Sequence, residues 1–268
     1  MPPLGGIYKY FMNRRFLNLT LSLLSIVLFI GIWHLCTAVL QIVPSNTLPS
    51  PERVFQSFIK KFTNPNPDGA TLIQHTVASL NVALTGYAWA LLIGLPLGII
   101  MAWIPLVDRF VRPLFDLLKP IPGVAWIPLM IVIFGLGIAS KAAVVFFSAV
   151  VPCVLNSYTG IKQTKDVHLW VARTFGASNI QKLFTIAIPT ALPHILTGTR
   201  VALGAAWVAI VAAELLGATR GLGFMIQQSR GIFRTDIIIV GMFAIGICGG
   251  ILTTILTWIS NLLLKGRR

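Results

Sequence analysis

The chain has 268 residues, of which 56% are hydrophobic and only 10% are charged. Soluble domains typically carry about 25% charged residues, so this composition cannot cover a water-facing surface and predicts a protein that mostly faces lipid. The formal net charge is +14, but Lys and Arg stand singly or in pairs between apolar runs. That pattern is typical of loops beside anionic lipid headgroups and argues against nucleic acid as a partner.

Residues 1–18 carry Lys9, Arg14 and Arg15 ahead of an apolar run, an order that is typical of signal peptides. The run itself, 19–43, is too long for the apolar part of a signal peptide, and no small-residue cleavage site follows it. We therefore interpret residues 1–18 as a cytoplasmic segment and 19–43 as an uncleaved first transmembrane helix.

Five further apolar runs can cross the hydrocarbon core of a bilayer, which takes roughly 20 residues of helix. They are residues 82–104, 114–135, 142–161, 192–216 and 237–264. Because backbone polar groups in lipid must be paired within their own segment, the predicted fold class is an all-α integral membrane protein with about six transmembrane helices. Pro120, Pro122 and Pro128 predict a bend in the third span, which serves either as a gating hinge or simply to fit its neighbours.

An even number of spans places both termini on one side of the membrane. Of the 21 Lys and Arg residues, we assign 14 to the side of the termini and seven to the other side. The positive-inside rule then predicts that both termini are cytoplasmic, including a short tail at residues 265–268.

The cytoplasmic connection at 162–190 contains Trp170-Val-Ala-Arg-Thr-Phe-Gly176 and, after nine intervening residues, Ile186-Ala-Ile-Pro189. This order predicts a short helix, a glycine turn and a second helix that stops before the proline. A helix pair that protrudes from the bilayer needs another surface to pack against, unless it is an ordinary amphipathic connector. Spacing alone leaves both interpretations open.

The order Ala172, Gly176, Ile186, Pro189 resembles the EAA loop of ABC-importer permeases, whose short coupling helix docks in a groove of an ATPase subunit. The same family is suggested by Leu48-Pro-Ser-Pro51, His75-x3-Ser79, Lys119-Pro-Ile-Pro-Gly-Val-Ala-Trp126, Phe134-Gly-Leu-Gly137 and Ala218-Thr-Arg-Gly-Leu-Gly-Phe-Met225. As a set, over about residues 45–264, these segments are similar to permeases for taurine, aliphatic sulfonates, nitrate and bicarbonate. The acidic position that opens the family's loop is Trp170 here, so we do not expect the polar contact that this acid makes.

The resemblance implies the transmembrane domain of a type I ABC importer in a bacterial inner membrane. It assigns ATPase coupling to Ala172, Arg173, Gly176, Ala177, Ile188 and Pro189. Its implied partners are a second permease copy (a homodimer), ABC ATPase subunits that bind ATP and Mg, a periplasmic or lipid-anchored solute-binding protein, and membrane lipids. The chain has no G-x-x-x-x-G-K-[ST] phosphate loop and no His spacing typical of a metal site, so we expect it to bind no cofactor or metal and to catalyse no reaction itself.

The resemblance also implies a translocation path on the two-fold axis of the dimer, lined mainly by the third and fifth helices. Arg200 and Glu214, both in the fifth, are 14 positions apart, which is about 21 Å along a helix, so they cannot pair. Ionisable residues inside a membrane are functional candidates, although headgroup depth for Arg200 and a helix end for Glu214 explain them equally well. We hypothesise that Glu214 and Arg220 shape an outer gate, and that Trp126, Trp207 and Arg200 belong to the path.

The expected solute is a small anion such as taurine or another sulfonate, nitrate or bicarbonate. Importers of thiamine precursors share the same framework and stay open as an alternative. An ion-coupled secondary transporter usually needs carboxylates in the middle of the membrane, and only Glu214 is a candidate here. An intramembrane enzyme ranks lower still, because no paired carboxylates, HExxH or Ser/His/Asp set is visible.

Overall fold

The computed structural model describes residues 4–265, with side chains from Leu17 onward except at positions 18 and 19. This part of the chain is helical and contains no strand. Five of its helices are long and apolar enough to cross a membrane, or up to six if one bent pair counts as a span, which confirms the predicted fold class. The long helices are α1 (Leu4–His34), α3 (Leu72–Trp103), α6 (Ile138–Lys162), α9 (Ile188–Gly217) and α11 (Thr235–Lys265).

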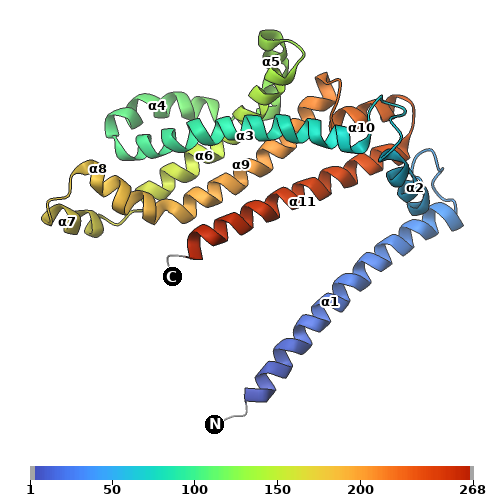
Figure 1. Cartoon of the computed structure of the whole chain (residues 1–268), viewed down its shortest axis with the longest axis horizontal. Coiled ribbons are helices and arrows are strands. Elements are labelled where there is room, and N and C mark those ends of the chain that lie inside the picture. The colour runs from blue at the N-terminus through green and yellow to red at the C-terminus, as the bar shows by residue number, and fades with distance from the viewer. Residues whose placement is uncertain (1–3, 266–268) are drawn as a thin grey trace.

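Shorter helices connect and extend these spans. They are η1 (Leu35–Val39), α2 (Pro51–Lys61), α4 (Pro105–Leu118), η2 (Gly123–Trp126), α5 (Ile127–Phe134), α7 (Asp166–Thr174), α8 (Asn179–Lys182), η3 (Leu183–Ala187) and α10 (Leu222–Gly231). In Figure 1, α7 and α8 lie at one end of the bundle and α2 and α10 at the other. We call these the α7 end and the α10 end.

The centre of the bundle is a close packing of α3, α6 and α9. Small residues allow this approach: a Cβ atom added to Gly86 would lie 2.5 Å from the Ala142 carbonyl oxygen, and one added to Gly98 would lie 2.1 Å from the Ser157 hydroxyl. Lipid gives helices no hydrophobic reason to associate, so membrane bundles depend on such close backbone contact.

The third predicted span is broken. Helix α4 and the η2–α5 segment meet at an angle of 85°. Pro120 and Pro122 lie in the break, where neither can donate a backbone hydrogen bond, whereas Pro128 lies in the first turn of α5, where no donor is needed. Gly123 allows the break to pack closely against α6, because a Cβ at this position would lie 1.7 Å from the Ser148 hydroxyl oxygen.

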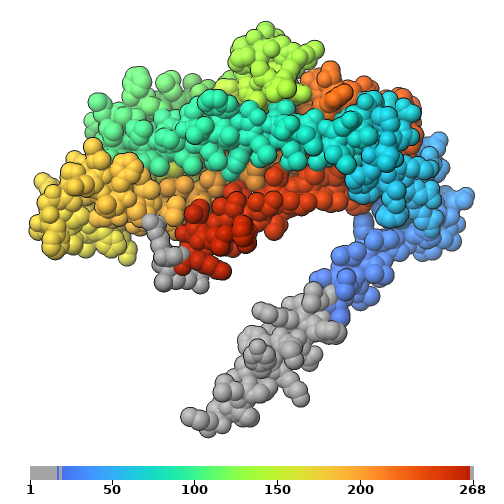
Figure 2. Space-filling view, in the orientation of Figure 1, coloured from blue at the N-terminus to red at the C-terminus, as the bar shows by residue number. Residues whose placement is uncertain are grey.

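Helix α1 stands apart from the bundle and approaches it only near α2 (Figures 1 and 2). The Trp33 indole N–H donates to the Pro49 carbonyl at 3.1 Å and fixes this junction. Between α1 and α11 lies an apolar groove of about 800 Å³, whose walls include Phe29 and Phe243. Of the expected cytoplasmic segment 1–18, residues 1–3 lie outside the described residues, and of the expected tail 265–268 only Lys265 is described.

Candidate functional site

At the α7 end, the glycine turn predicted from the sequence has the geometry of a Schellman helix ending. Gly176 has a φ of +78°, which side-chain-bearing residues rarely adopt. Its N–H donates to the Arg173 carbonyl at 3.0 Å, and the Ala177 N–H donates to the Ala172 carbonyl at 3.0 Å. The four residues Ala172, Arg173, Gly176 and Ala177 are therefore the ones that end α7 and set the direction of the chain beyond it.

The second helix of this connection begins with a capping box. The Ser178 hydroxyl accepts from the Gln181 N–H at 3.2 Å, while the Gln181 side chain accepts from the Ser178 N–H at 2.8 Å. The prediction that this helix stops before Pro189 is wrong, because α8, η3 and α9 run on as one apolar segment of 39 residues, Asn179–Gly217. Pro189 lacks a backbone N–H, and the wider π turn of η3 just before it carries the helix through this gap.

Apolar side chains crowd the surface of this helix pair. Trp170, Phe175, Ile180 and Phe184 are 66%, 87%, 70% and 64% exposed, and neither α7 nor α8 has a buried residue. We call these four residues, with Val167, the α7–α8 face. Val167 and Trp170 lie in α7 and Phe175 directly follows it, whereas Ile180 and Phe184 belong to the apolar segment Asn179–Gly217. Exposed apolar clusters of this kind mark sites that contact another protein or the membrane.

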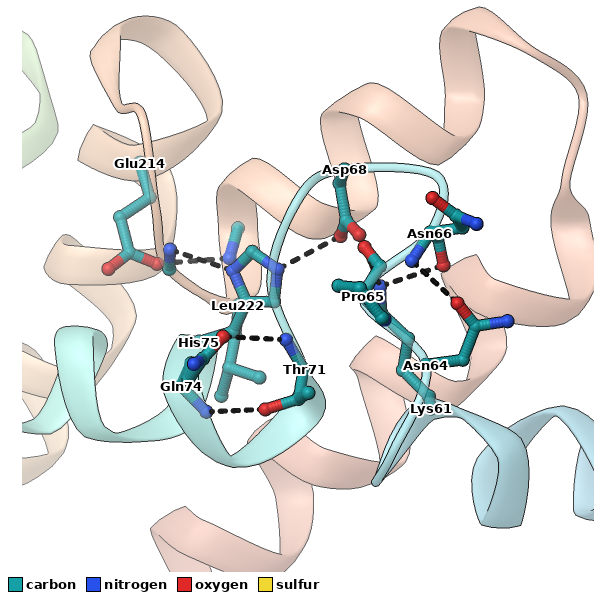
Figure 3. A network of polar contacts seen from close by, with 12 residues as sticks. Lys61, Asn64, Pro65, Asn66, Asp68, Thr71, Gln74, His75, Glu214 and Leu222 are labelled. Atoms are coloured by element: carbon teal, nitrogen blue, oxygen red, sulfur yellow. Dashed lines mark hydrogen bonds and ion pairs between the residues drawn. The ribbon is translucent and has the colours of Figure 1, made fainter.

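At the α10 end, a chain of buried polar contacts runs through the loop between α2 and α3 (Figure 3). Lys61 donates to the Asp68 carboxylate and, at 3.0 Å, to the Asn66 carbonyl. His75 Nε2 lies 3.0 Å from Asp68, and His75 Nδ1 accepts from the Gly221 N–H at 3.1 Å, so the imidazole proton is on Nε2. Burial by itself raises the pKa of Asp68, but the hydrogen bonds from His75 and Lys61 and the positive charge of Lys61 outweigh it and hold the pKa below its usual value.

The same network continues to Glu214, which is 1% exposed. The Ser79 hydroxyl lies 2.8 and 2.9 Å from the two carboxylate oxygens, and the Gly223 N–H donates to Glu214 at 3.0 Å. The Leu222 N–H donates in turn to Ser79 at 2.9 Å. These contacts join the end of α9 to the start of α10 and to α3. The carboxylate is thus enclosed by helix packing within this chain.

The other predicted path residues lie apart from this network. Trp207 is buried between α9 and α11, and its indole N–H donates to the Ile245 carbonyl at 3.1 Å. Trp126 stacks on Phe147 with 4.5 Å between ring centroids. Arg200 donates to Ser260 at 3.3 Å, and Arg220 is exposed beside the turn that enters α10.

The comparisons with known proteins agree with this arrangement. The family described as "binding-protein-dependent transport system inner membrane component" matches residues 94–268. The chain belongs to this family. The taurine transport system permease protein TauC of Escherichia coli (strain K12) is 37% identical over 86% of this chain and 83% of its own length.

Further relatives have the same type of function in their names. The bicarbonate transport system permease protein CmpB of Synechocystis is 28% identical to this permease over 97% of the chain and 94% of its own length. A solved structure of the MetNI methionine ABC transporter in inward-facing conformations has a TM-score of 0.60 and 18% identity, covering 73% of this permease and 95% of that chain. The sequence-based recognition is confirmed, and the structural likeness shows the shared fold.

Sequence reasoning missed two features of this permease. It did not connect His75 to Asp68, which lies in the loop before α3, or to Lys61, which is the last residue of α2. It also counted Lys141 only among the seven basic residues on the side opposite the termini, whereas Lys141 lies in α6 and is only 9% exposed. A buried lysine inside an apolar segment is a detectable signal once the helix boundary is known.

Proposed function

We propose that this permease forms the translocation pathway of an ATP-driven, binding-protein-dependent importer of a small anion, and that it works by alternating access. The observation that carries this proposal is the α7–α8 face, an apolar surface with a defined Schellman turn and no partner helix within the described part of the chain. ATPase subunits that bind ATP and Mg dock on this face. The α7 end, together with both termini, then faces the cytoplasm.

The coupling mechanism follows from the continuity of α8, η3 and α9. A movement imposed on the α7–α8 face is transmitted along a helical segment of 39 residues, about 58 Å long, to the opposite end of the bundle. There the Glu214 network ties α9 to α10 and α3, so these helices move together. Rigid-body tilting of this unit exchanges the inward-open and outward-open states. Ile188 and Pro189 are the first two residues of α9, directly after η3. They therefore lie where the helix pair that carries the α7–α8 face joins the long helix that transmits the movement.

The path itself lies between two permease copies, along α5 and α9. The 85° break at Pro120 and Pro122 is the proposed hinge of the third span, with Pro128 fixing the start of its outer half. Arg220, which is exposed, contacts the solute or closes over it at the outer gate. Glu214 supports that gate by holding the corner between α9 and α10, while Trp126, Trp207 and Arg200 fix the helices around the path.

The relatives named for taurine and for bicarbonate support a small anion as the solute, supplied by a periplasmic or lipid-anchored binding protein. A thiamine-precursor importer is the alternative. The discriminating experiment identifies the binding protein that copurifies with the complex and measures which of these solutes shifts its melting temperature. An ion-coupled transporter is disfavoured, because Glu214 is enclosed and hydrogen-bonded.

Replacement of Gly176 by Val tests the docking role. The space around Gly176 is open, so Val causes no clash, but its β-branched side chain is strained at a φ of +78° and changes the direction of the turn. We expect the variant to insert into membranes normally but to lose copurification of the ATPase and ATP-dependent uptake in proteoliposomes. Gly246→Val is the matched control, since Gly246 also faces open space but lies within helix α11. Normal ATPase copurification and uptake in Gly176→Val would refute the proposal.

A further inference from the structure

Lys141 is buried at the α10 end without a polar partner. Its side chain is 9% exposed, and no hydrogen bond or ion pair to its ammonium group exists among the residues that the structure describes. Its positive charge acts on the Glu214 carboxylate through space. The hydrogen-bond donors to that carboxylate are Ser79 and Gly223, so the carboxylate does not bind the lysine directly. A lysine with so little exposed surface and no partner is a functional candidate in a membrane protein.

The surroundings of Lys141 add further positive potential. It lies in the first turn of α6, a helix of 25 residues, where the backbone dipoles place partial positive charge. Gly137 precedes this helix and has no side chain that could accept from the first-turn N–H groups. A lysine at a helix N-terminus is unfavourable by itself, whereas an anion placed there is stabilised by both the lysine and the helix end.

A pocket of suitable size lies at this position. It measures about 160 Å³ and is lined by Leu136, Gly137, Lys141, Leu216, Gly217, Ala218 and Thr219. These residues come from the turn between α5 and α6, the start of α6, the last turn of α9 and the turn after it. The pocket therefore lies between the ends of the two helices that we propose to line the path, with the Thr219 hydroxyl as an additional hydrogen-bonding group.

We propose that this pocket binds the oxyanion group of the transported solute, a sulfonate, carboxylate or bicarbonate, on Lys141 and the N-terminus of α6. The proposal rests on the importer function proposed above and assigns the solute class to a particular lysine. The Lys141 ammonium group and an oxyanion form charge-assisted hydrogen bonds, which are stronger than hydrogen bonds between neutral groups. Leu136 and Leu216 add apolar side chains at the rim of the pocket. Docking of an ATPase plays no part in this binding step.

The test uses the full-length purified permease in phosphatidylcholine nanodiscs, without ATPase or binding protein. The melting temperature is measured against increasing sodium ethanesulfonate or sodium bicarbonate, with sodium chloride at equal ionic strength as the reference. We expect a saturable rise above chloride for the wild type. Lys141→Gln should weaken the apparent affinity at least about tenfold, as expected for loss of a charge-assisted contact, while Lys141→Arg should retain binding.

The matched control is Lys60→Gln, which removes an exposed lysine of α2 at the same end of the bundle and should behave as the wild type. Absence of a saturable rise in the wild type, or an equal rise in Lys141→Gln, overturns the proposal and leaves Lys141 as a counter-charge for Glu214. A second set of discs contains phosphatidylglycerol. If this lipid alone removes the Lys141-dependent response, the pocket holds a lipid phosphate and the assignment to the solute is overturned. None of these outcomes depends on ATPase copurification, so they are separate from the test of the importer function.

Discussion

Replacement of Glu214 measures how strongly the network at the α10 end holds the bundle together. Glu214→Ala leaves the Ser79 hydroxyl and the Gly223 N–H without their acceptor in a buried site. Hydrogen bonds to charged groups contribute about 1.5–3 kcal/mol each. Removal of the carboxylate that accepts both hydrogen bonds should therefore lower the free energy of unfolding by about 3–5 kcal/mol. Glu214→Gln keeps the shape and one carbonyl oxygen, which can accept from both donors, so its cost should be about 1 kcal/mol.

The assay is equilibrium unfolding of the purified permease in mixed micelles with increasing SDS, followed by tryptophan fluorescence. Glu52→Ala is the control, because the Glu52 side chain is 74% exposed at the same end of the bundle. Ser79→Ala and the double variant Ser79→Ala/Glu214→Ala complete a double-mutant cycle. Because Ser79 and Glu214 are in contact, we expect an interaction energy of about 0.5–3 kcal/mol between the two substitutions. Equal stability of Glu214→Ala and Glu52→Ala, or additive effects with Ser79→Ala, would refute the assignment of Glu214 to a stabilising network.

Two further predictions concern the same end of the permease. Gly221→Ala should destabilise the permease at least as much as Glu214→Ala. The reason is that Gly221 has a φ of +134° and an added Cβ would lie 2.2 Å from the carboxyl carbon of Glu214. The same SDS titration measures this effect, and a variant as stable as the wild type would contradict the prediction. The pKa of Asp68 is lowered in the folded state by His75 and Lys61, so its contribution to stability is present in full above about pH 4 and is lost as the pH falls through the folded pKa. The melting temperatures of the wild type and Asp68→Asn should therefore converge below about pH 4, and a constant difference down to pH 3 would contradict this.

Hydropathy predicts the all-helical fold class of this permease, because lipid forces backbone polar groups into helices and leaves few alternatives. It places the start of the second span at residue 82, whereas α3 begins at Leu72. The additional turns contain His75 and Ser79, which a hydropathy scale scores as water-facing. Both are fully buried and accept hydrogen bonds from the Gly221 and Leu222 N–H groups, so their polarity does not indicate exposure.

The network itself could not be predicted from the sequence. Gly221 and His75 are 146 positions apart, and no periodicity relates contacts at such a separation. The connection at 162–190 is the opposite case. Its Schellman turn and its capping box are local, with partners three to five residues apart, so Gly176 and Ser178 carry the information in the sequence itself. Only the continuation of α8 into α9 was missed, because the π turn that admits Pro189 has no simple sequence signal.

The two ends of α9 differ in how far their side chains find partners within the chain. This difference supports the proposal that another subunit drives the movement of this one. At the α10 end, polar groups are enclosed and paired within the chain, so α9, α10 and α3 form a unit that resists relative movement. At the α7 end, the α7–α8 face offers exposed aromatic side chains and short helices, which are held mainly by their own caps. Under the function proposed above, a movement imposed at Trp170 and Phe175 would pass along the helical segment Asn179–Gly217 to the corner at Glu214, where α9, α10 and α3 are tied together.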